Sequence, residues 1–241
     1  MNRYGLARDI PDQVKLAVRQ ACGFGCVLCG APVVQYDHFA PEFKDARAHD
    51  PAGIALLCGS CHDRKTRRRT SAAAVAKARA APFALREGFV REPLEIGAGD
   101  VTVMLGEMRV TRCPVILRVR GKDVISIDPP ELAGGPHRVN AAFANTSGHP
   151  LCRIIDNEIE LRVSPWDIEF VGPTPIVKSA PGAIALSLTT IPGEGLRVDQ
   201  MDIVQAGLRV RIEANGDVVL PGENRFRGGQ LAGAGAAIVI Q

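Results

Sequence analysis

The sequence predicts an α+β protein in which a small domain, stapled by a zinc ion, precedes an all-β domain. The staple is predicted by two C-x2-C pairs, Cys26 with Cys29 and Cys58 with Cys61. The all-β domain is predicted by a change of character, because short β-prone runs between Gly, Pro, Asn and Asp clusters replace helical patterns. The expected boundaries are 1–82 for the first domain, 83–92 for a linker and 93–241 for the second domain.

The composition predicts a soluble, cytoplasmic protein. The chain has 241 residues, of which 46% are hydrophobic, so it can bury a sizeable core. No run approaches the ~18 apolar residues of a transmembrane helix, and the charged start MNRYGLARDIPDQ lacks the apolar segment of a signal peptide. Seven cysteines, four of them in a metal-ligand pattern, favour a reducing compartment and no disulfide.

The charge is unevenly distributed along the chain. The net charge is +3, but residues 1–90 contain 14 Lys and Arg against 8 Asp and Glu, whereas the remainder contains 15 against 18. A basic first third favours contact with a polyanion, although an excess of this size is also common on proteins that bind nothing charged. The charge therefore supports a nucleic-acid partner only in combination with a site.

The first domain shows local patterns on both sides of each cysteine pair. Apolar residues spaced at i, i+3, i+4 and i+7 predict an amphipathic helix, and a run of β-formers predicts a strand. The expected elements are a helix over 11–21, a strand over 33–39, a polar loop over 40–53, a helix over 62–70, and a helix over 72–80 that Ser71 caps and Pro82 stops.

The second domain is predicted from short runs of strand-forming residues separated by turn signals such as Asn215-Gly216. No repeat period holds across these runs, so a sandwich or an irregular barrel is favoured over a β-helix. The runs are VTVML, VILRV, VISI, IELRV, AIALSL, LRVRI, VVL and AAIVI.

The two C-x2-C pairs are separated by 28 residues. Each pair forms a turn that aims two thiolates at one point, and two such turns match the tetrahedral, four-sulfur preference of structural zinc. We therefore expect a closed site that stabilises a segment too short for a large core. The other cysteines, Cys22, Cys113 and Cys152, are expected to be thiols outside this site, the last two in the core.

Three residues between and after the cysteine pairs are candidates for chemistry. Asp37 and His38 lie on the expected strand, and His62 directly follows the last cysteine. A zinc staple would hold strand and helix side by side and bring Asp37 close to His62. A carboxylate and an imidazole, with further positions left to water and substrate phosphate, fit an open Mg²⁺ or Mn²⁺ site. His38 alternates to another direction on the strand and is free to act on water.

The order of CGFGCVLCG, YDHF and LLCGSCHDRKT resembles the HNH (ββα-metal) endonuclease family in its four-cysteine form, over roughly residues 8–70. The resemblance implies a metal-dependent endonuclease that hydrolyses phosphodiester bonds of DNA, with double-stranded DNA as the favoured substrate. It implies that His38 is the general base. It also implies that Asp37 and His62 hold the catalytic Mg²⁺ or Mn²⁺.

One position departs from the family pattern. Family members usually have Asn in a sequence resembling N-L-x-x-L-C, and this chain has Gly53 there. Glycine has no side chain with which to fix the loop near the base. Two polar residues of the preceding turn, His49 and Asp50, are candidates to take over this role.

A run of cations follows His62 closely and is expected to contact the phosphates on either side of the cut. Such contacts make binding sensitive to salt but carry no sequence information. The run consists of Lys65, Arg67, Arg68 and Arg69, and further candidates for the same surface are Arg3, Arg8, Lys15 and Arg19.

Two other classes of function stay open. A zinc-stapled module could retain the grip on nucleic acid without the reaction, and Gly53 favours that alternative. The β domain could instead sense a ligand, form a homo-oligomer or recognise a target, and so regulate the nuclease. Restriction of foreign DNA, a mobile-element role and repair all fit the sequence, and a small nuclease joined to an unrelated domain favours defence or mobile-element biology.

Overall fold

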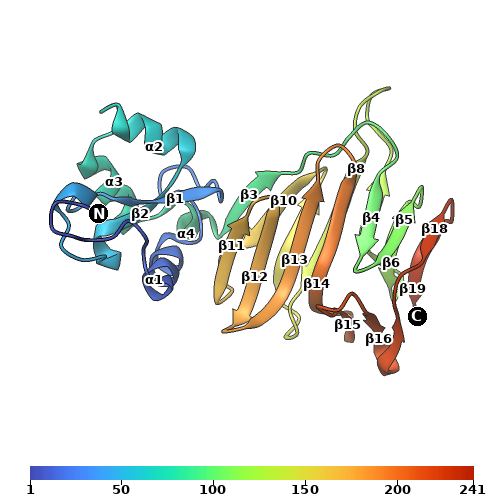
Figure 1. Cartoon of the computed structure of the whole chain (residues 1–241). Helices are drawn as coiled ribbons and strands as arrows, with labels where there is room; N and C mark the ends of the chain where they lie inside the picture. Colours follow the sequence, from blue (N-terminus) through green and yellow to red (C-terminus); the bar gives the residue numbers. More distant parts are fainter. The chain divides into compact units, whose positions relative to one another are not determined.

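The structure, a computed structural model, describes all 241 residues, which divide into two compact units, Met1–Arg91 and Glu92–Gln241. The first unit contains every α-helix and one pair of strands, and the second consists of strands and one single-turn helix, η3 (Pro221–Glu223) (Figure 1). The α+β class predicted from the sequence is therefore confirmed. The expected linker 83–92 contains the short helix α4 (Phe83–Glu87) and most of strand β3 (Phe89–Pro93). No helix has both the length and the apolar character needed to span a membrane.

The first unit is built around an antiparallel pair of strands, β1 and β2, in which Asp37 lies opposite Ala55 and His38 opposite Ile54. Two single-turn helices lie in the connecting loop, which the sequence predicted to be a loop. The elements are α1 (Asp12–Cys22), β1 (Val34–His38), η1 (Phe43–Asp45), η2 (Pro51–Gly53), β2 (Ile54–Cys58), α2 (Gly59–Thr66), α3 (Ala72–Ala80) and α4.

The helix α1 confirms the prediction made from apolar spacing. It follows Pro11 and ends at Gly23, whose left-handed backbone (φ 68°) donates back to the carbonyl of Gln20. Left-handed glycine is a common way to end a helix because it has no Cβ to clash. Val18 and Cys22 on the inner face of α1 are completely buried.

The helix expected over 62–70 is wrong at its C-terminal end. The helix α2 stops at Thr66, because Arg68 adopts a left-handed conformation (φ 59°) and the amide of Arg69 donates to the carbonyl of Arg64. The next helix, α3, agrees with the prediction. The hydroxyl of Ser71 caps it by accepting from the amide of Ala74 at 3.1 Å.

The core of the first unit lies beneath β2. Ile54, Leu56 and Leu57 have no exposed surface, and they pack with residues of α1 and α3. The guanidinium of Arg79 donates to the carbonyls of Ile54 and Ala21, both at 3.1 Å. Arg79 therefore ties α3 to β2 and to the end of α1, which fixes the strand that leads into the second cysteine pair.

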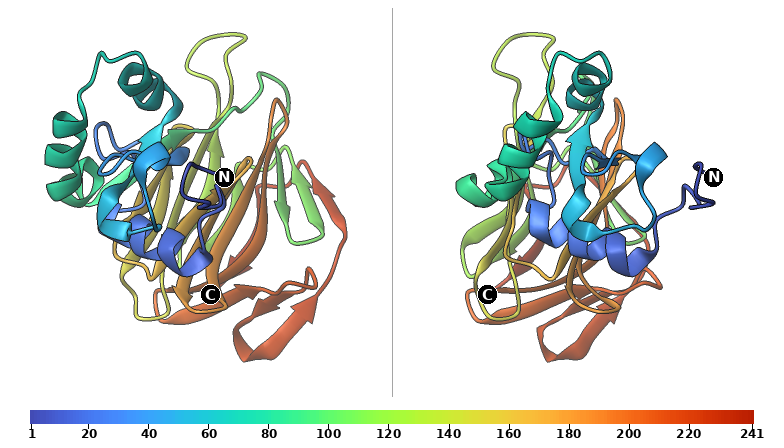
Figure 2. Two further views of the ribbon diagram at one scale, coloured as in Figure 1. Left: turned by 60° about the vertical axis from the view of Figure 1, so that its left-hand side comes forward. Right: turned by 90° about the vertical axis from the view of Figure 1, so that its left-hand side faces the viewer.

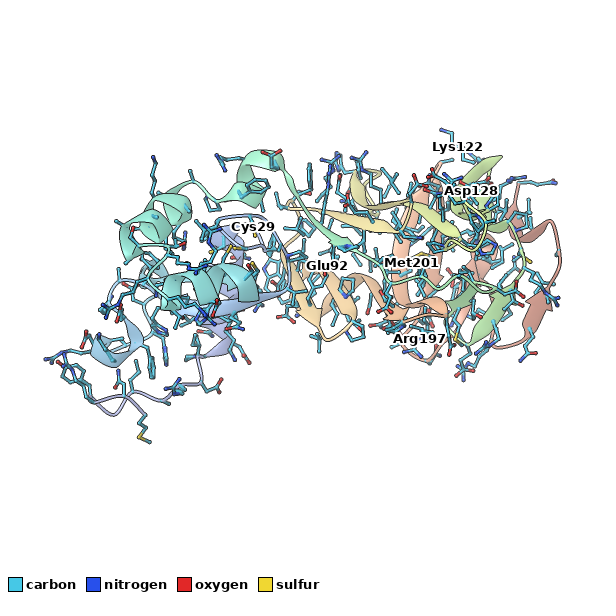
Figure 3. All side chains as sticks on the ribbon, turned by 90° about the horizontal axis from the view of Figure 1, so that it is seen from above. Cys29, Glu92, Lys122, Asp128, Arg197 and Met201 are labelled. Carbon is cyan, nitrogen blue, oxygen red and sulfur yellow. The ribbon has the colours of Figure 1, made fainter.

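The second unit contains two sheets that lie as separate layers (Figures 1 and 3) and do not close into a barrel. All eight predicted runs fall on strands. The first sheet contains β6 (Val115–Val119), β7 (Lys122–Asp128), β8 (Arg138–Ala144), β9 (Pro150–Ile155), β10 (Glu158–Arg162) and β19 (Ala236–Ile240). The second contains β4 (Thr102–Leu105), β5 (Met108–Thr111), β11 (Asp167–Val171), β12 (Thr174–Ala180), β13 (Ala183–Ile191), β14 (Gly195–Gln205), β15 (Leu208–Ile212), β16 (Val218–Leu220), β17 (Asn224–Phe226) and β18 (Gln230–Ala232).

The long strand β14 divides the second sheet. Its first half, from Gly195 to Val198, pairs in parallel with β4, whereas its second half, from Met201, pairs antiparallel with β15. The C-terminal segment then joins both layers, because β18 pairs with β5 and β19 pairs with β6 (Figure 2). Cys113 and Cys152 are buried in this unit, as predicted.

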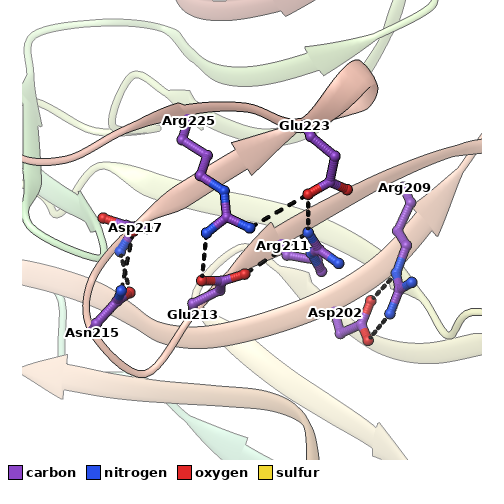
Figure 4. A network of polar contacts seen from close by, with 8 residues as sticks. All are labelled: Asp202, Arg209, Arg211, Glu213, Asn215, Asp217, Glu223 and Arg225. Carbon is purple, nitrogen blue, oxygen red and sulfur yellow. Dashed lines mark hydrogen bonds and ion pairs between the residues drawn. The ribbon is translucent and has the colours of Figure 1, made fainter.

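Arginines of the second unit are paired with carboxylates where β14 to β17 meet (Figure 4). Arg209 donates to both oxygens of Asp202 at 2.7 Å, and Arg211 and Arg225 both contact Glu223. Exposed pairs of this kind add little stability. They do neutralise the cations, so this surface does not offer the unpaired positive charge that a polyanion requires.

Candidate functional site

The four predicted cysteines form one cluster. The sulfurs of Cys26, Cys29, Cys58 and Cys61 all lie within 4.8 Å of one another (Figure 3, beside Cys29). The sulfur of Cys29 is 3.6 Å from that of Cys58 and 3.8 Å from that of Cys61. A tetrahedral zinc ion with Zn–S bonds of about 2.3 Å separates its sulfurs by about 3.8 Å. The donor set and its spacing therefore suit zinc.

Backbone hydrogen bonds shape the cluster before any metal is considered. The amide of Gly30 donates to the carbonyl of Cys26 at 2.8 Å, and Gly30 has the positive φ (81°) that this turn requires. The amide of Val27 donates to the carbonyl of Leu56 at 2.9 Å, which joins the first cysteine pair to β2. The second pair lies where β2 ends and α2 begins, so one cluster fixes the strand relative to the helix.

Burial makes two of the four thiols, Cys29 and Cys61, reluctant to ionise by themselves. It raises the pKa of Cys29 to about 11, and it also raises the pKa of Cys61. Zinc binds thiolates, so binding would release these protons and replace them with a divalent charge. The cluster is thus suited to hold a structural metal and offers no free position for a reaction.

The cysteine cluster brings Asp37 and His62 together. Asp37 on β1 is 7% exposed, and its Oδ1 lies 3.5 Å from Nε2 of His62 in the first turns of α2. Oδ2 of Asp37 is buried and has no hydrogen-bond donor. A buried carboxylate next to an imidazole is a donor set that fits Mg²⁺ or Mn²⁺.

Lys65 also lies at this carboxylate. Its ammonium group donates to Oδ1 of Asp37 at 3.0 Å and lies 2.8 Å from Oδ2, a close ion pair without hydrogen-bond geometry. It is 3.4 Å from the carbonyl oxygen of His38, and the Lys65 side chain is only 13% exposed. The sequence suggested a phosphate contact for Lys65, and the structure shows it paired with Asp37.

His38 follows Asp37 on β1 and lines the same cavity, but its ring contacts a different set of residues. Its Nε2 is 3.0 Å from Nδ1 of His49, and its ring meets Phe43 edge-on with centroids 5.4 Å apart. Burial, followed by the neighbouring His49, lowers the pKa of His38 below the ordinary value of 6.5. The imidazole is therefore neutral at pH 7 and able to accept a proton.

The backbone at Gly53 leaves no space for a side chain. A Cβ at this position would lie 2.2 Å from the carbonyl oxygen of Ala40. The carbonyl of Gly53 accepts instead from the amides of Phe39 and Ala40, at 3.0 and 3.3 Å. Of the two substitutes suggested by the sequence, Asp50 caps η2 through the amide of Ala52, and only His49 contacts His38.

A cavity of about 750 Å³ lies over these residues. Asp37, His38 and His62 line it, and so do four cations from different parts of the unit. These cations are Arg8, Lys44, Lys65 and Arg68. Glu42 lines the cavity as well, and Lys44 pairs with Glu42 as Lys65 pairs with Asp37. Arg8 and Arg68 therefore supply the excess of positive charge that suits a phosphate backbone. Arg8 also lies over the ring of Phe43, 5.3 Å from its centroid.

The other predicted cations do not line this cavity. Arg67 pairs with Asp63 at 2.9 Å on the exposed side of α2, and Arg69 lies beyond the end of that helix. Arg3 pairs with Asp45, and Lys15 with Asp9. Lys44 is a lining residue that the sequence did not indicate, because nothing local predicts that η1 turns toward the strands.

The site thus consists of a strand pair and a helix clamped by four cysteines, with an acid and two histidines beside a cationic cavity. Residues 26–68 match the family model described as HNH endonuclease. The resemblance seen in the sequence is thereby confirmed for this part of the chain, and the match suggests a nuclease or nucleic-acid-binding role. Neither the curated proteins nor the solved structures gave a match.

Proposed function

We propose that the chain is a metal-dependent endonuclease that hydrolyses phosphodiester bonds of double-stranded DNA. The observation that carries the proposal is the 3.5 Å approach of His62 to the buried carboxylate of Asp37, with His38 on the next position of β1. The cluster of four cysteines explains why His62 lies close to Asp37, because Cys61 of the cluster and His62 are neighbours on α2. Two histidines and an acid with no catalytic role would have no need to converge on one cavity.

His38 would act as the general base. Its lowered pKa keeps the imidazole neutral at pH 7, and it takes a proton from a water molecule that attacks the phosphorus. The bond to the 3′ oxygen breaks as the new bond forms, and the leaving 3′ oxygen takes a proton from solvent water, which gives a 5′-phosphate and a 3′-hydroxyl. Arg8, Lys44 and Arg68, which line the cavity, would hold the flanking phosphates and exclude other orientations.

Asp37 and His62 would hold the divalent cation. When bound, Mg²⁺ or Mn²⁺ supplies positive charge next to the phosphate oxygens, where negative charge grows in the transition state. Lys65 would then lose its position at Asp37 and become available to a phosphate, as the sequence suggested. The burial of the Asp37 carboxylate and its approach to His62 support this assignment.

The proposal is tested by cleavage of supercoiled plasmid in the presence of Mg²⁺ or Mn²⁺, with binding to a labelled duplex measured in parallel. We expect nicked circles that require the divalent cation, with ends that carry a 5′-phosphate. Tight binding without any nicking would refute the nuclease and favour the alternative below.

A second candidate function is a nucleic-acid-binding module without the reaction. Two observations favour it: the ammonium of Lys65 is already paired with Asp37, and Gly53 replaces the usual Asn. A bound ammonium could substitute permanently for a divalent cation. The two candidates predict the same salt-sensitive binding and differ only in the plasmid assay.

The β unit has no proposed ligand. Its role as a sensor, a recognition part or a homo-oligomerisation surface remains a prediction, as do a cytoplasmic location and a part in defence or mobile-element biology. Isolation of the second unit and measurement of its mass in solution tests the oligomer directly.

A further inference from the structure

A pair of histidine rings lies beside the proposed reaction centre. Nε2 of His38 and Nδ1 of His49 are 3.0 Å apart, which is hydrogen-bonding distance. Phe43 contacts both rings, edge-on against His38 and nearly parallel to His49 at an interplanar angle of 16°. The orientation of the two imidazoles is therefore set by packing as well as by the hydrogen bond.

The loop that carries His49 is held on both sides. The side-chain amide of Asn2 donates to the carbonyls of Phe43 and Ala46, both at 2.6 Å. On the other side, Asp50 caps η2. His49 thus lies between two anchored points of the loop, which hold its ring next to His38 on β1.

The hydrogen bond decides which nitrogen of His38 can accept a proton. A neutral imidazole carries one proton, so one ring of the pair donates and the other accepts. Nε2 of His38 is engaged with His49, whereas Nδ1 of His38 has no hydrogen-bond partner and is not buried. Water can reach Nδ1. The neutral imidazole of His38 can accept a proton from water at Nδ1 only if the ring already carries its own proton on Nε2.

Building on the proposed nuclease function, we propose that His49 is a positioning residue for His38. Its Nδ1 accepts the hydrogen bond from Nε2–H of His38 and leaves Nδ1 of His38 free to take the proton of the attacking water. The water oxygen bonds to phosphorus while the bond to the 3′ oxygen breaks. His38 then carries a proton on both nitrogens, and His49 continues to accept from Nε2–H. In this arrangement the proton of His49 is on Nε2, which is buried and has no hydrogen-bond partner, so the pair leaves one N–H unpaired.

Two substitutions separate the acceptor from the ring. In His49→Asn, the side-chain oxygen is attached to Cγ and takes about the position of the imidazole Nδ1, so an acceptor for Nε2–H remains. In His49→Phe, the ring can still stack on Phe43, but no acceptor remains. A purely structural role for His49 predicts that the Phe variant is the better tolerated, and our assignment predicts the reverse.

The tautomer is read directly by long-range ¹H–¹⁵N NMR on the full, zinc-loaded chain labelled at its five histidines. We expect Nε2 of His38 to be protonated and Nδ1 unprotonated in the wild type and in His49→Asn, with loss of this preference in His49→Phe. A wild-type His38 protonated on Nδ1 would overturn the proposal. An unchanged spectrum of His38 in His49→Phe would overturn it as well.

Cleavage gives a second, independent reading. We expect His49→Phe to lower kcat by ~10-fold or more at unchanged KM, and His49→Asn to stay within about threefold of the wild type. Equal loss in both variants would refute the acceptor role. The NMR experiment needs no cleavage. If the expected tautomers were found in a protein that does not cut DNA, the proposed nuclease function would be refuted, but the role of His49 in orienting His38 would stand.

Discussion

Oδ1 of Asp37 lies 3.5 Å from Nε2 of His62, and the ammonium of Lys65 lies at the same carboxylate, 2.8 Å from Oδ2. The imidazole of His62 and the ammonium of Lys65 thus both contact the carboxylate of Asp37, which is almost completely buried. Lys65 and a divalent cation would compete for Asp37, because both need its oxygens. The competition makes the metal dependence of this protein measurable without any substrate.

Substitution of Lys65 by Met should therefore lower stability and increase the response to divalent cations. Loss of the ammonium leaves a buried carboxylate without its ion pair, which costs about 3 kcal/mol. A divalent cation that binds Asp37 and His62 would restore much of this, so the rise in Tm with Mn²⁺ should be larger in Lys65→Met than in the wild type. Thermal unfolding with and without Mn²⁺ measures both quantities.

The matched control for that measurement is Lys44→Met. Lys44 lines the same cavity, but its ammonium pairs with Glu42 at 2.9 Å and its side chain is largely exposed. Its response to Mn²⁺ should equal that of the wild type. A response of Lys65→Met no larger than that of the wild type would mean that no divalent cation binds at Asp37.

Removal of zinc should unfold the first unit and leave the second folded. The first unit has a small core, and structural zinc contributes about 10–16 kcal/mol of binding free energy to small domains of this kind. All α-helices belong to the first unit, so the helical circular dichroism signal reports on it alone. We expect a strong chelator, or Cys58→Ser, to remove that signal while the β signal persists.

Cys22→Ala serves as the control for zinc loss. Cys22 is buried in the same core but lies outside the four-sulfur cluster. The variant should keep one zinc per chain, while Cys58→Ser should keep none. A full helical signal in Cys58→Ser without zinc would contradict the role given to the cluster.

Two adjacent arginines should differ in their effect on DNA binding. Arg68 lines the cationic cavity, whereas Arg67 is paired with Asp63 on the outer side of α2. Arg68→Ala should weaken binding for all sequences alike and reduce the slope of log K against log salt by about 1. Arg67→Ala should change the slope by much less, and fluorescence anisotropy in a His38→Ala background measures both without cleavage. Equal effects of the two variants would place the DNA elsewhere.

The acid limb of the pH profile should lie below pH 6.5. Only neutral His38 can accept a proton, and burial together with His49 lowers its pKa below the ordinary value of 6.5. A lowered pKa means that a lower pH is needed to protonate the ring. Activity should accordingly persist as pH falls through 6.5 and decline only below it, as read from kcat/KM against pH. A midpoint of the acid limb above 6.5 would be inconsistent with this base.

Local patterns predicted most of the fold because their causes are local. The C-x2-C spacing, the cap at Ser71 and the apolar spacing in α1 each depend on neighbours in sequence, and each agrees with the structure. Strands with unusual composition were missed. An example is β8, with the sequence RVNAAFA, which contains poor strand formers and is a strand because it pairs on both sides with β7 and β9.

The site was predictable only in part, because some of its contacts depend on residues that are distant in sequence. Asp37, His38 and His62 occupy motif positions, but the contacts of Lys65 and His49 depend on where a helix and a loop return to β1. The parallel pairing of β4 with β14 has no local signal either, because these strands are far apart in sequence. Pairings of this kind follow from the whole fold.

The most direct test of the account is the rate of plasmid nicking by the wild type and by His38→Ala, both with one zinc per chain and saturating Mg²⁺ or Mn²⁺. We predict that the wild type nicks the plasmid and that His38→Ala is slower by ~100-fold or more, with unchanged zinc content and DNA affinity. Equal nicking by the two proteins, or none by the wild type, would contradict the proposal that His38 takes the proton from water at this site.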